Sequence, residues 1–295
     1  MRPDYVTRFA PSPTGPLHLG HAYSAMVAWD RAQAAGGLFL LRIEDTDAAR
    51  CKPGYEAAIY EELQWLGIRW PEPVLRQSAN ENAYRAALNQ LIHMGICYPC
   101  NCSRGDIRNA LSAPQEGATP LGPDGVTYPG TCRGRAMADA APGDAIRLDM
   151  ARAVAQLGDV ARFGFVEAGP EETGLHRMNA DYLTRQFGDV VLARRDTAEA
   201  AYHLAVVVDD AAQGVSEVVR GVDLAGATYV HLLLQALLQL PTPSYYHHSL
   251  IRDDAGKRLA KRDDARALSK YRAEGATPAD IRGLVGLAKN PSKGF

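Results

Sequence analysis

The hydrophobic and polar positions of the first fifty residues predict two strands separated by a helix. Residues 5–9 are a short, partly alternating run, and residues 38–43 are a nearly unbroken apolar run. Such an unbroken run is typical of a strand buried on both faces of a parallel sheet. Residues 18–35 have a helix-forming composition, and Gly36 with Gly37 ends that helix. Strand, helix and strand in this order indicate a right-handed βαβ unit.

Further elements show the same two periodicities. Residues 54–66 carry apolar side chains at helical spacing, and Ser78 with Glu81 predicts a capping box that opens a helix ending near Gly95. The strand pattern then resumes in a second half of the sheet. The strands expected there are residues 189–192, 202–208 and 215–219, and a helix expected over residues 228–240 is stopped by Pro241.

These elements predict an α/β fold with a Rossmann-type parallel sheet, interrupted by an insertion and followed by a small helical C-terminal segment. Residues 99–145 are dense in Pro, Gly and Cys and lack sustained periodicity, which indicates the insertion. Four segments are expected: residues 1–98 and 187–250 as the two halves of the core, 99–186 as the insertion and its connection, and 251–295 as the C-terminal segment.

Composition narrows the class of protein. The 295 residues are 46% hydrophobic and 22% charged, which is typical of a folded globular chain. No apolar stretch approaches the roughly 20 residues of a membrane helix, and no basic-then-apolar segment opens the chain. Five cysteines without an export signal favour thiols or a metal over disulfides. We therefore expect a cytoplasmic protein without a membrane segment. No feature of the sequence requires an oligomer, so we expect a monomer.

Charge is uneven along the chain. The formal net charge is −2, yet residues 252–272 contain eight basic and four acidic residues. A polyanion would have to be bound by such a local basic patch.

Residues 8–21, Arg-Phe-Ala-Pro-Ser-Pro-Thr-Gly-Pro-Leu-His-Leu-Gly-His, lead from the first strand into the first helix. The N-terminus of a helix that follows a parallel strand favours the binding of phosphate groups. His18 and His21 are three apart and project from one face, so their imidazoles can stabilise charge that develops on a phosphoryl group. Gly20 lets a nucleotide approach the backbone closely.

This string resembles the first signature of the class I aminoacyl-tRNA synthetases, in the form found in glutamyl-tRNA synthetases. The resemblance continues at residues 42–47, Arg-Ile-Glu-Asp-Thr-Asp, at residues 213–221 and at residues 256–262, Gly-Lys-Arg-Leu-Ala-Lys-Arg. The last stretch is similar to the family's second signature, with Arg258 and Ala260 in place of a lysine and a serine. The resemblance implies Mg²⁺-dependent ATP chemistry with catalytic residues His18, His21 and Lys261, and ATP contacts from His18, Gly20, His21, Arg258, Leu259 and Lys261.

The resemblance also implies L-glutamate as a substrate. Arginines can hold carboxylates in pairs of hydrogen bonds, and a carboxylate can take the ammonium group. The residues matching the family's amino-acid site are Arg8, Phe9, Ala10, Pro11, Ser12 and Glu44 from the first half, and Tyr202 and Arg220 from the second.

Three cysteines in the insertion, Cys100, Cys102 and Cys132, form a candidate metal site. A tetrahedral Zn²⁺ site needs a fourth ligand, and no histidine lies between residues 94 and 175. A metal-free thiol cluster is the alternative. The spacing is similar to Cys-x-Cys…Tyr-x-x-x-Cys in short paralogues of glutamyl-tRNA synthetase, which implies one structural Zn²⁺ with Tyr128 as the fourth ligand.

Chain length separates these paralogues from full glutamyl-tRNA synthetases. Only about thirty residues come after Arg262, too few for a helical anticodon-binding domain. The resemblance then implies transfer of glutamate to queuosine, a modified base in the anticodon loop of tRNA(Asp), with RNA approaching residues 252–272. Three alternatives remain: a minimal glutamyl-tRNA synthetase that charges the tRNA 3′ end, an inactive RNA-binding paralogue, and a nucleotidyltransferase with only the paired histidines.

Overall fold

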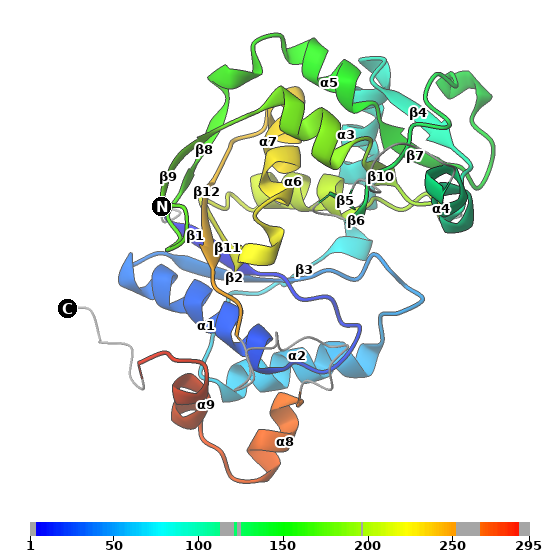
Figure 1. The fold of residues 1–295 in the computed structure, drawn as a ribbon. Coiled ribbons are helices and arrows are strands. Elements are labelled where there is room, and N and C mark those ends of the chain that lie inside the picture. Colours follow the sequence, from blue (N-terminus) through cyan, green and yellow to red (C-terminus); the bar gives the residue numbers. More distant parts are fainter. Residues whose placement is uncertain (1–3, 113–120, 123–124, 196, 252–265, 289–295) are drawn as a thin grey trace.

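The computed structural model describes residues 4–112, 121–122, 125–195, 197–251 and 266–288 of the chain. It has an α/β architecture in which helices cover both faces of a largely parallel sheet (Figure 1). The predicted α/β class with a parallel sheet is therefore confirmed for the part of the chain that is described.

The first half of the sheet has the predicted strand–helix–strand order. Strands β1 (Val6–Phe9) and β2 (Leu38–Ile43) pair in parallel, with Val6 opposite Leu38, and α1 (Leu19–Ala34) connects them. Helix α2 (Pro53–Trp65) then leads to β3 (Leu75–Arg76), which adds to β2 in parallel. All four residues of β1 are buried, including the polar Thr7 and the charged Arg8.

The second half of the sheet places β11 (Glu217–Gly221) beside β12 (Ser244–His248), followed by β8 (Gly164–Glu167) and β9 (Gly174–Arg177). Strands β11, β12 and β8 are parallel, and β9 is antiparallel. The two halves meet at β1 and β11, where the backbone N–H of Ser216 donates to the Val6 carbonyl at 3.0 Å. This junction positions the candidate functional site.

Two hydrophobic cores lie on opposite faces of the sheet. One contains buried residues of α1, α2 and α9 (Pro278–Leu284), and the other contains those of α3 (Glu81–His93), α6 (Tyr202–Ala212) and α7 (Ala227–Leu238). Val218 and Val219 are neighbours on β11, yet Val218 belongs to one core and Val219 to the other. This alternation is what a strand buried on both faces requires.

The cysteine-rich part of the chain forms a separate antiparallel sheet. Its strands are β4 (Cys97–Cys100), β7 (Ala145–Leu148) and β10 (Val191–Ala193). The remaining elements are α4 (Arg104–Ser112), α5 (Met150–Leu157), α8 (Leu268–Ala273), the pair β5 (Leu121–Gly122) and β6 (Gly125–Val126), and the short helices η1 (Gln77–Ala79), η2 (Met137–Asp139), η3 (Val160–Arg162), η4 (Tyr182–Phe187) and η5 (Val222–Leu224). Among the described residues, no helix combines the length and apolarity needed to cross a membrane.

Three sequence predictions were wrong. The strand expected at residues 189–192 in the second half of the sheet is β10, which pairs with β7 in the separate antiparallel sheet. The expected strand at residues 202–208 is the first part of α6, because an unbroken buried run fits a core helix as well as a strand. Ser78 does not cap a helix: it donates from its backbone and hydroxyl to Asp45, and α3 begins after Asn80 instead.

Candidate functional site

A pocket of ≈ 380 Å³ opens where β1, β2 and β11 end, at the junction of the two halves of the sheet. We call it the Arg8–Arg220 pocket, after the arginines that line it from β1 and β11. Open α/β sheets bind their ligands at this edge. The sequence-predicted residues that line the pocket are Arg8, Phe9, Ala10, Pro11, Ser12, His21, Glu44, Tyr202 and Arg220.

The two histidines of the first signature cap the start of α1. The backbone N–H of Gly20 donates to Nδ1 of His18 at 3.1 Å, and the backbone N–H of His18 donates to Nδ1 of His21 at 3.2 Å. Their rings lie 3.8 Å apart, so they share one face as predicted. Because each Nδ1 accepts a hydrogen bond, each neutral ring carries its proton on Nε2 and can donate from there.

Arg8 is held in place by a carboxylate from the second half of the fold. Its Nε donates to Oδ1 of Asp210 at 3.0 Å, and its Nη1 donates to the carbonyl of Val219 at 3.2 Å. Asp210 also accepts from Arg42 at 2.7 Å. All three charged side chains are buried, so the network fixes the direction in which Arg8 presents its remaining N–H groups.

Glu44 comes directly after β2 and brings a carboxylate into the pocket. Arg42 donates to its Oε1 at 3.3 Å, and the backbone N–H of Glu44 donates to the carbonyl of Pro11 at 3.0 Å. Burial raises the pKa of Glu44, although the charges of Arg42 and Arg8 oppose this. An ionised Glu44 can therefore accept hydrogen bonds from an ammonium group, whereas a protonated one loses that attraction.

Arg220 makes four hydrogen bonds, all to other elements of the second half. Nε donates to His247 at 3.1 Å. Nη1 donates to Tyr202 and His231, both at 3.2 Å, and Nη2 donates to Thr228 at 2.7 Å. A guanidinium has five N–H groups, so one N–H on Nη2 lies outside these bonds. A paired grip on a carboxylate by Arg220 requires the exchange of one of these four contacts.

His247 connects Arg220 to a buried carboxylate. Burial and the charge of Arg220 lower the pKa of His247 to about 4, so the ring is neutral at pH 7. Its Nε2 accepts from Arg220, and Nδ1 therefore donates to Glu167, which also accepts from the backbone N–H groups of His247 and Gly169. Glu167 and His247 thus position the arginine.

Three of these residues, Asp210, Glu167 and His247, were missed by the sequence analysis. Asp210 had a usable signal, because it comes after Asp209 in an otherwise apolar run and both carboxylates are buried. The His247–Glu167 contact joins residues 80 positions apart, and no spacing rule predicts it.

The second signature, with Arg258, Leu259 and Lys261, lies outside the described residues. A few positions further along the chain, residues 267–269 contact the first signature and its surroundings. Ala267 forms a bridge with His18, and the backbone N–H of Leu268 donates to the carbonyl of Leu17 at 2.9 Å. Glu62 of α2 accepts from the backbone N–H of Ser269 at 3.1 Å. Residues 267–269 are therefore anchored beside the first signature.

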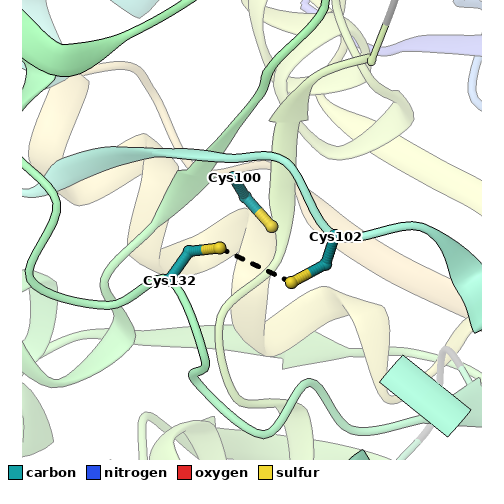
Figure 2. Close-up of side chains that lie close together, drawn as sticks. All are labelled: Cys100, Cys102 and Cys132. Carbon is teal, nitrogen blue, oxygen red and sulfur yellow. Dashed lines mark hydrogen bonds between the residues drawn. The ribbon is translucent and has the colours of Figure 1, made fainter. Parts of the chain in front are cut away.

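The three predicted cysteines converge, as Figure 2 shows. Their sulfur atoms lie within 4.8 Å of one another, and the Sγ atoms of Cys102 and Cys132 are 3.5 Å apart. The Tyr128 hydroxyl lies 3.4 Å from the sulfurs of both Cys100 and Cys102. The guanidinium carbon of Arg147 lies over the Tyr128 ring, 3.8 Å from its centroid.

This geometry fits a tetrahedral zinc site. Zinc–sulfur bonds of about 2.3 Å and a zinc–oxygen bond of about 2.0 Å give tetrahedral edges of about 3.8 Å between sulfurs and about 3.5 Å from sulfur to oxygen. The observed separations are close to both. Burial acts to raise the pKa of the Cys132 thiol, but hydrogen bonds with Tyr128 and Asn101 outweigh it and lower that pKa to about 7. Burial raises the pKa of the Cys102 thiol to about 11, so this thiol loses its proton as a metal binds.

Comparison with known proteins identifies the class first. The family "tRNA synthetases class I (E and Q), catalytic domain" matches residues 4–123 and 173–291. The chain belongs to this family, and the paired histidines and the Arg8–Arg220 pocket lie in the matched residues.

Relatives narrow the comparison further. The chain is 59% identical over 285 residues to the Glutamyl-Q tRNA(Asp) synthetase of Rhodobacter capsulatus, covering 96% of this chain and 100% of the relative. It is 41% identical over 272 residues to the protein of the same name from Geobacter sulfurreducens, covering 92% of this chain and 80% of the relative. The names of both relatives specify a glutamyl group and tRNA(Asp).

Solved structures agree on the fold. A glutamate tRNA ligase from Elizabethkingia meningosepticum, crystallised with its amino acid, superposes with a TM-score of 0.73 at 26% identity. The match covers 96% of this chain but 60% of that ligase, so the chain spans less than two thirds of its length. Methionyl-tRNA synthetase from Mycobacterium tuberculosis, at 12% identity and a TM-score of 0.63, shares the fold.

Proposed function

We propose that this protein activates L-glutamate with ATP and transfers the glutamyl group to queuosine in the anticodon loop of tRNA(Asp). The observation that carries the proposal is the Arg8–Arg220 pocket, in which two buried arginines and Glu44 supply both signs of charge that glutamate requires. The names of the relatives, at 59% and 41% identity, support queuosine as the acceptor.

Glutamate binding uses residues from both halves of the sheet. Arg8 and Arg220 hold the two carboxylates, and Glu44 accepts from the ammonium group. Ser12 and the Tyr202 hydroxyl supply neutral hydrogen bonds, and residues 9–11 form the wall beside them. Since Asp210 and His247 fix the arginines before the substrate arrives, little ordering is required on binding.

Activation is a displacement at phosphorus. A carboxylate oxygen of glutamate attacks the α-phosphorus of Mg²⁺-bound ATP, the bond to the bridging oxygen breaks, and pyrophosphate leaves with that electron pair. The Nε2–H groups of His18 and His21 and the ammonium of Lys261 stabilise the negative charge of the transition state. Gly20, Arg258 and Leu259 contact the nucleotide.

Transfer completes the reaction. A hydroxyl oxygen on the cyclopentenediol ring of queuosine attacks the carbonyl carbon of the adenylate, and AMP leaves as the new ester forms. The hydroxyl proton passes to solvent or to the departing phosphate. The basic segment of residues 252–272 attracts the RNA, so affinity decreases with salt.

The cysteine-rich part of the chain holds a structural zinc ion through Cys100, Cys102, Tyr128 and Cys132. A closed four-ligand site supplies stability rather than chemistry. The separations of 3.5 Å between two of the sulfurs and 3.4 Å from sulfur to the phenol oxygen support this assignment.

The enzyme acts as a cytoplasmic monomer.

An anticodon stem-loop that carries queuosine but has no acceptor stem tests the function. Incubation with ATP and labelled glutamate is expected to label this fragment. A minimal glutamyl-tRNA synthetase would leave the fragment unlabelled and would label only the 3′ end of an intact tRNA. Unlabelled fragment with active glutamate-dependent pyrophosphate exchange would therefore contradict the proposed acceptor.

A further inference from the structure

A second cavity, of ≈ 420 Å³, is lined by residues of the β8–β9 hairpin and of the start of α7. Aromatic rings form its walls: Phe165 and His176 are stacked with centroids 5.2 Å apart, and Tyr229 meets Phe165 edge-on at 5.5 Å. Tyr182 lies 4.9 Å from Tyr229. We call it the Tyr229 cavity. Flat faces of this kind suit a planar ring.

The Tyr229 cavity is acidic. Glu167, Glu171 and Glu172 line it, and none of the described residues that line it is lysine or arginine. Glu167 is buried and bonded to His247, whereas Glu171 and Glu172 are exposed. Burial raises the pKa of Tyr229, and the neighbouring Tyr182 and the charge of Glu172 raise it further. The negative field therefore extends to the aromatic wall.

One turn of the chain separates the Tyr229 cavity from the Arg8–Arg220 pocket. Gly221, Asp223 and Leu224 line the pocket, whereas Val222, Ala225 and Gly226 line the cavity. The side chains also connect them, because His247 lines the cavity and accepts a hydrogen bond from Arg220 in the pocket. A ligand in the cavity would therefore lie next to the proposed glutamate site.

An acidic cavity is unusual beside an RNA-acylating site, because carboxylates repel the phosphate backbone. It favours a planar base that carries a positive charge, since aromatic faces and carboxylates both attract cations. The queuosine base has this chemistry: its cyclopentenediol ring is joined through an aminomethyl link whose secondary amine is protonated at neutral pH.

We propose that the Tyr229 cavity binds the queuosine base, with the ring against Tyr229 and Tyr182 and the secondary ammonium near Glu171 and Glu172. The inference rests on the proposed function and adds the site that selects the acceptor base. It explains how the enzyme distinguishes queuosine from an unmodified guanine at the same position, since guanine lacks the cation.

The test compares two anticodon stem-loops, one with queuosine and one with guanosine at the same position. The measured quantity is the ratio of their dissociation constants, in which the general effect of charge on RNA affinity cancels. We expect Glu172→Gln to reduce the preference about threefold and Glu172→Lys to reduce it about tenfold. Glu81→Lys changes the net charge equally at an exposed glutamate of α3 and is expected to leave the ratio unchanged.

Melting temperatures equal to that of the wild-type protein show that the variants are folded. A wild-type protein that binds both stem-loops equally, or a Glu172→Lys variant that retains the full preference, would overturn the cavity assignment. Failure of the proposed function is a different result: the wild-type protein, ATP and glutamate would leave the queuosine stem-loop unlabelled.

Discussion

The Nε of Arg8, on β1, lies 3.0 Å from Oδ1 of Asp210 in α6, and both side chains are buried. This contact joins residues 202 positions apart and connects the two halves of the sheet at the Arg8–Arg220 pocket. Asp210 also binds Arg42, so one carboxylate contacts two buried arginines. The proposed substrate pocket and the stability of the fold therefore depend on the same carboxylate.

Asp210→Asn is expected to lower the free energy of unfolding by about 3–5 kcal/mol at pH 7, because the buried Arg8 loses its paired carboxylate and the buried Arg42 loses one of its three. Urea unfolding of both proteins measures the difference. Burial acts to raise the pKa of Asp210, but the charges of Arg8 and Arg42 outweigh it and lower that pKa. A lowered pKa gives stability that is present at neutral pH and lost as the pH falls below about 4, so the difference should narrow there. A pH-independent difference would contradict this account.

Glu44→Gln tests the ammonium site. We expect kcat/KM for glutamate in pyrophosphate exchange to fall about 100-fold, because a neutral amide cannot balance the substrate's charge. As the pH falls, protonation of Glu44 should weaken the binding of the substrate. Because the pKa of Glu44 is raised, this loss should begin at a higher pH than for a carboxylate side chain with an ordinary pKa. The Glu44→Gln variant should lose this pH dependence. If the variant loses affinity on acidification at the same pH as the wild-type enzyme, Glu44 does not bind the ammonium group.

Zinc can be measured directly in the purified protein by elemental analysis. We expect one zinc per chain, and Cys102→Ser should weaken zinc affinity by about tenfold or more and lower the melting temperature. Cys51→Ser is the matched control, because Cys51 is a free thiol outside the cluster. Stoichiometric zinc retained by a Cys100, Cys102 and Cys132 triple serine variant would place the metal elsewhere.

Lys261→Ala is expected to reduce glutamate-dependent pyrophosphate exchange by about 100-fold or more, since the ammonium group proposed to contact the triphosphate is removed. Lys270→Ala, an exposed lysine on α8, is the control and should retain full exchange. Equal rates for the two variants would remove Lys261 from the catalytic set.

The sequence predicts the core of this fold well where the hydrophobic pattern fits only one kind of secondary structure. The β1–α1–β2 unit was predicted because its strands and helix differ in length and are separated by glycines. Residues 202–208 were mistaken for a strand because periodicity vanishes when every face is buried. Site residues near a motif, such as His21 and Glu44, were found in the pocket, whereas Asp210 and His247 act through contacts that exist only after folding.

The acceptor is the central claim, and a crossed pair of RNAs tests it most directly. One is tRNA(Asp) that carries queuosine but lacks its 3′-terminal adenosine, and the other is tRNA(Asp) with an intact 3′ end and guanosine in place of queuosine. Incubated with ATP and labelled glutamate, the first RNA is expected to be labelled and the second to remain unlabelled. Label on the second RNA alone would show that the protein charges the 3′ end and would contradict the account.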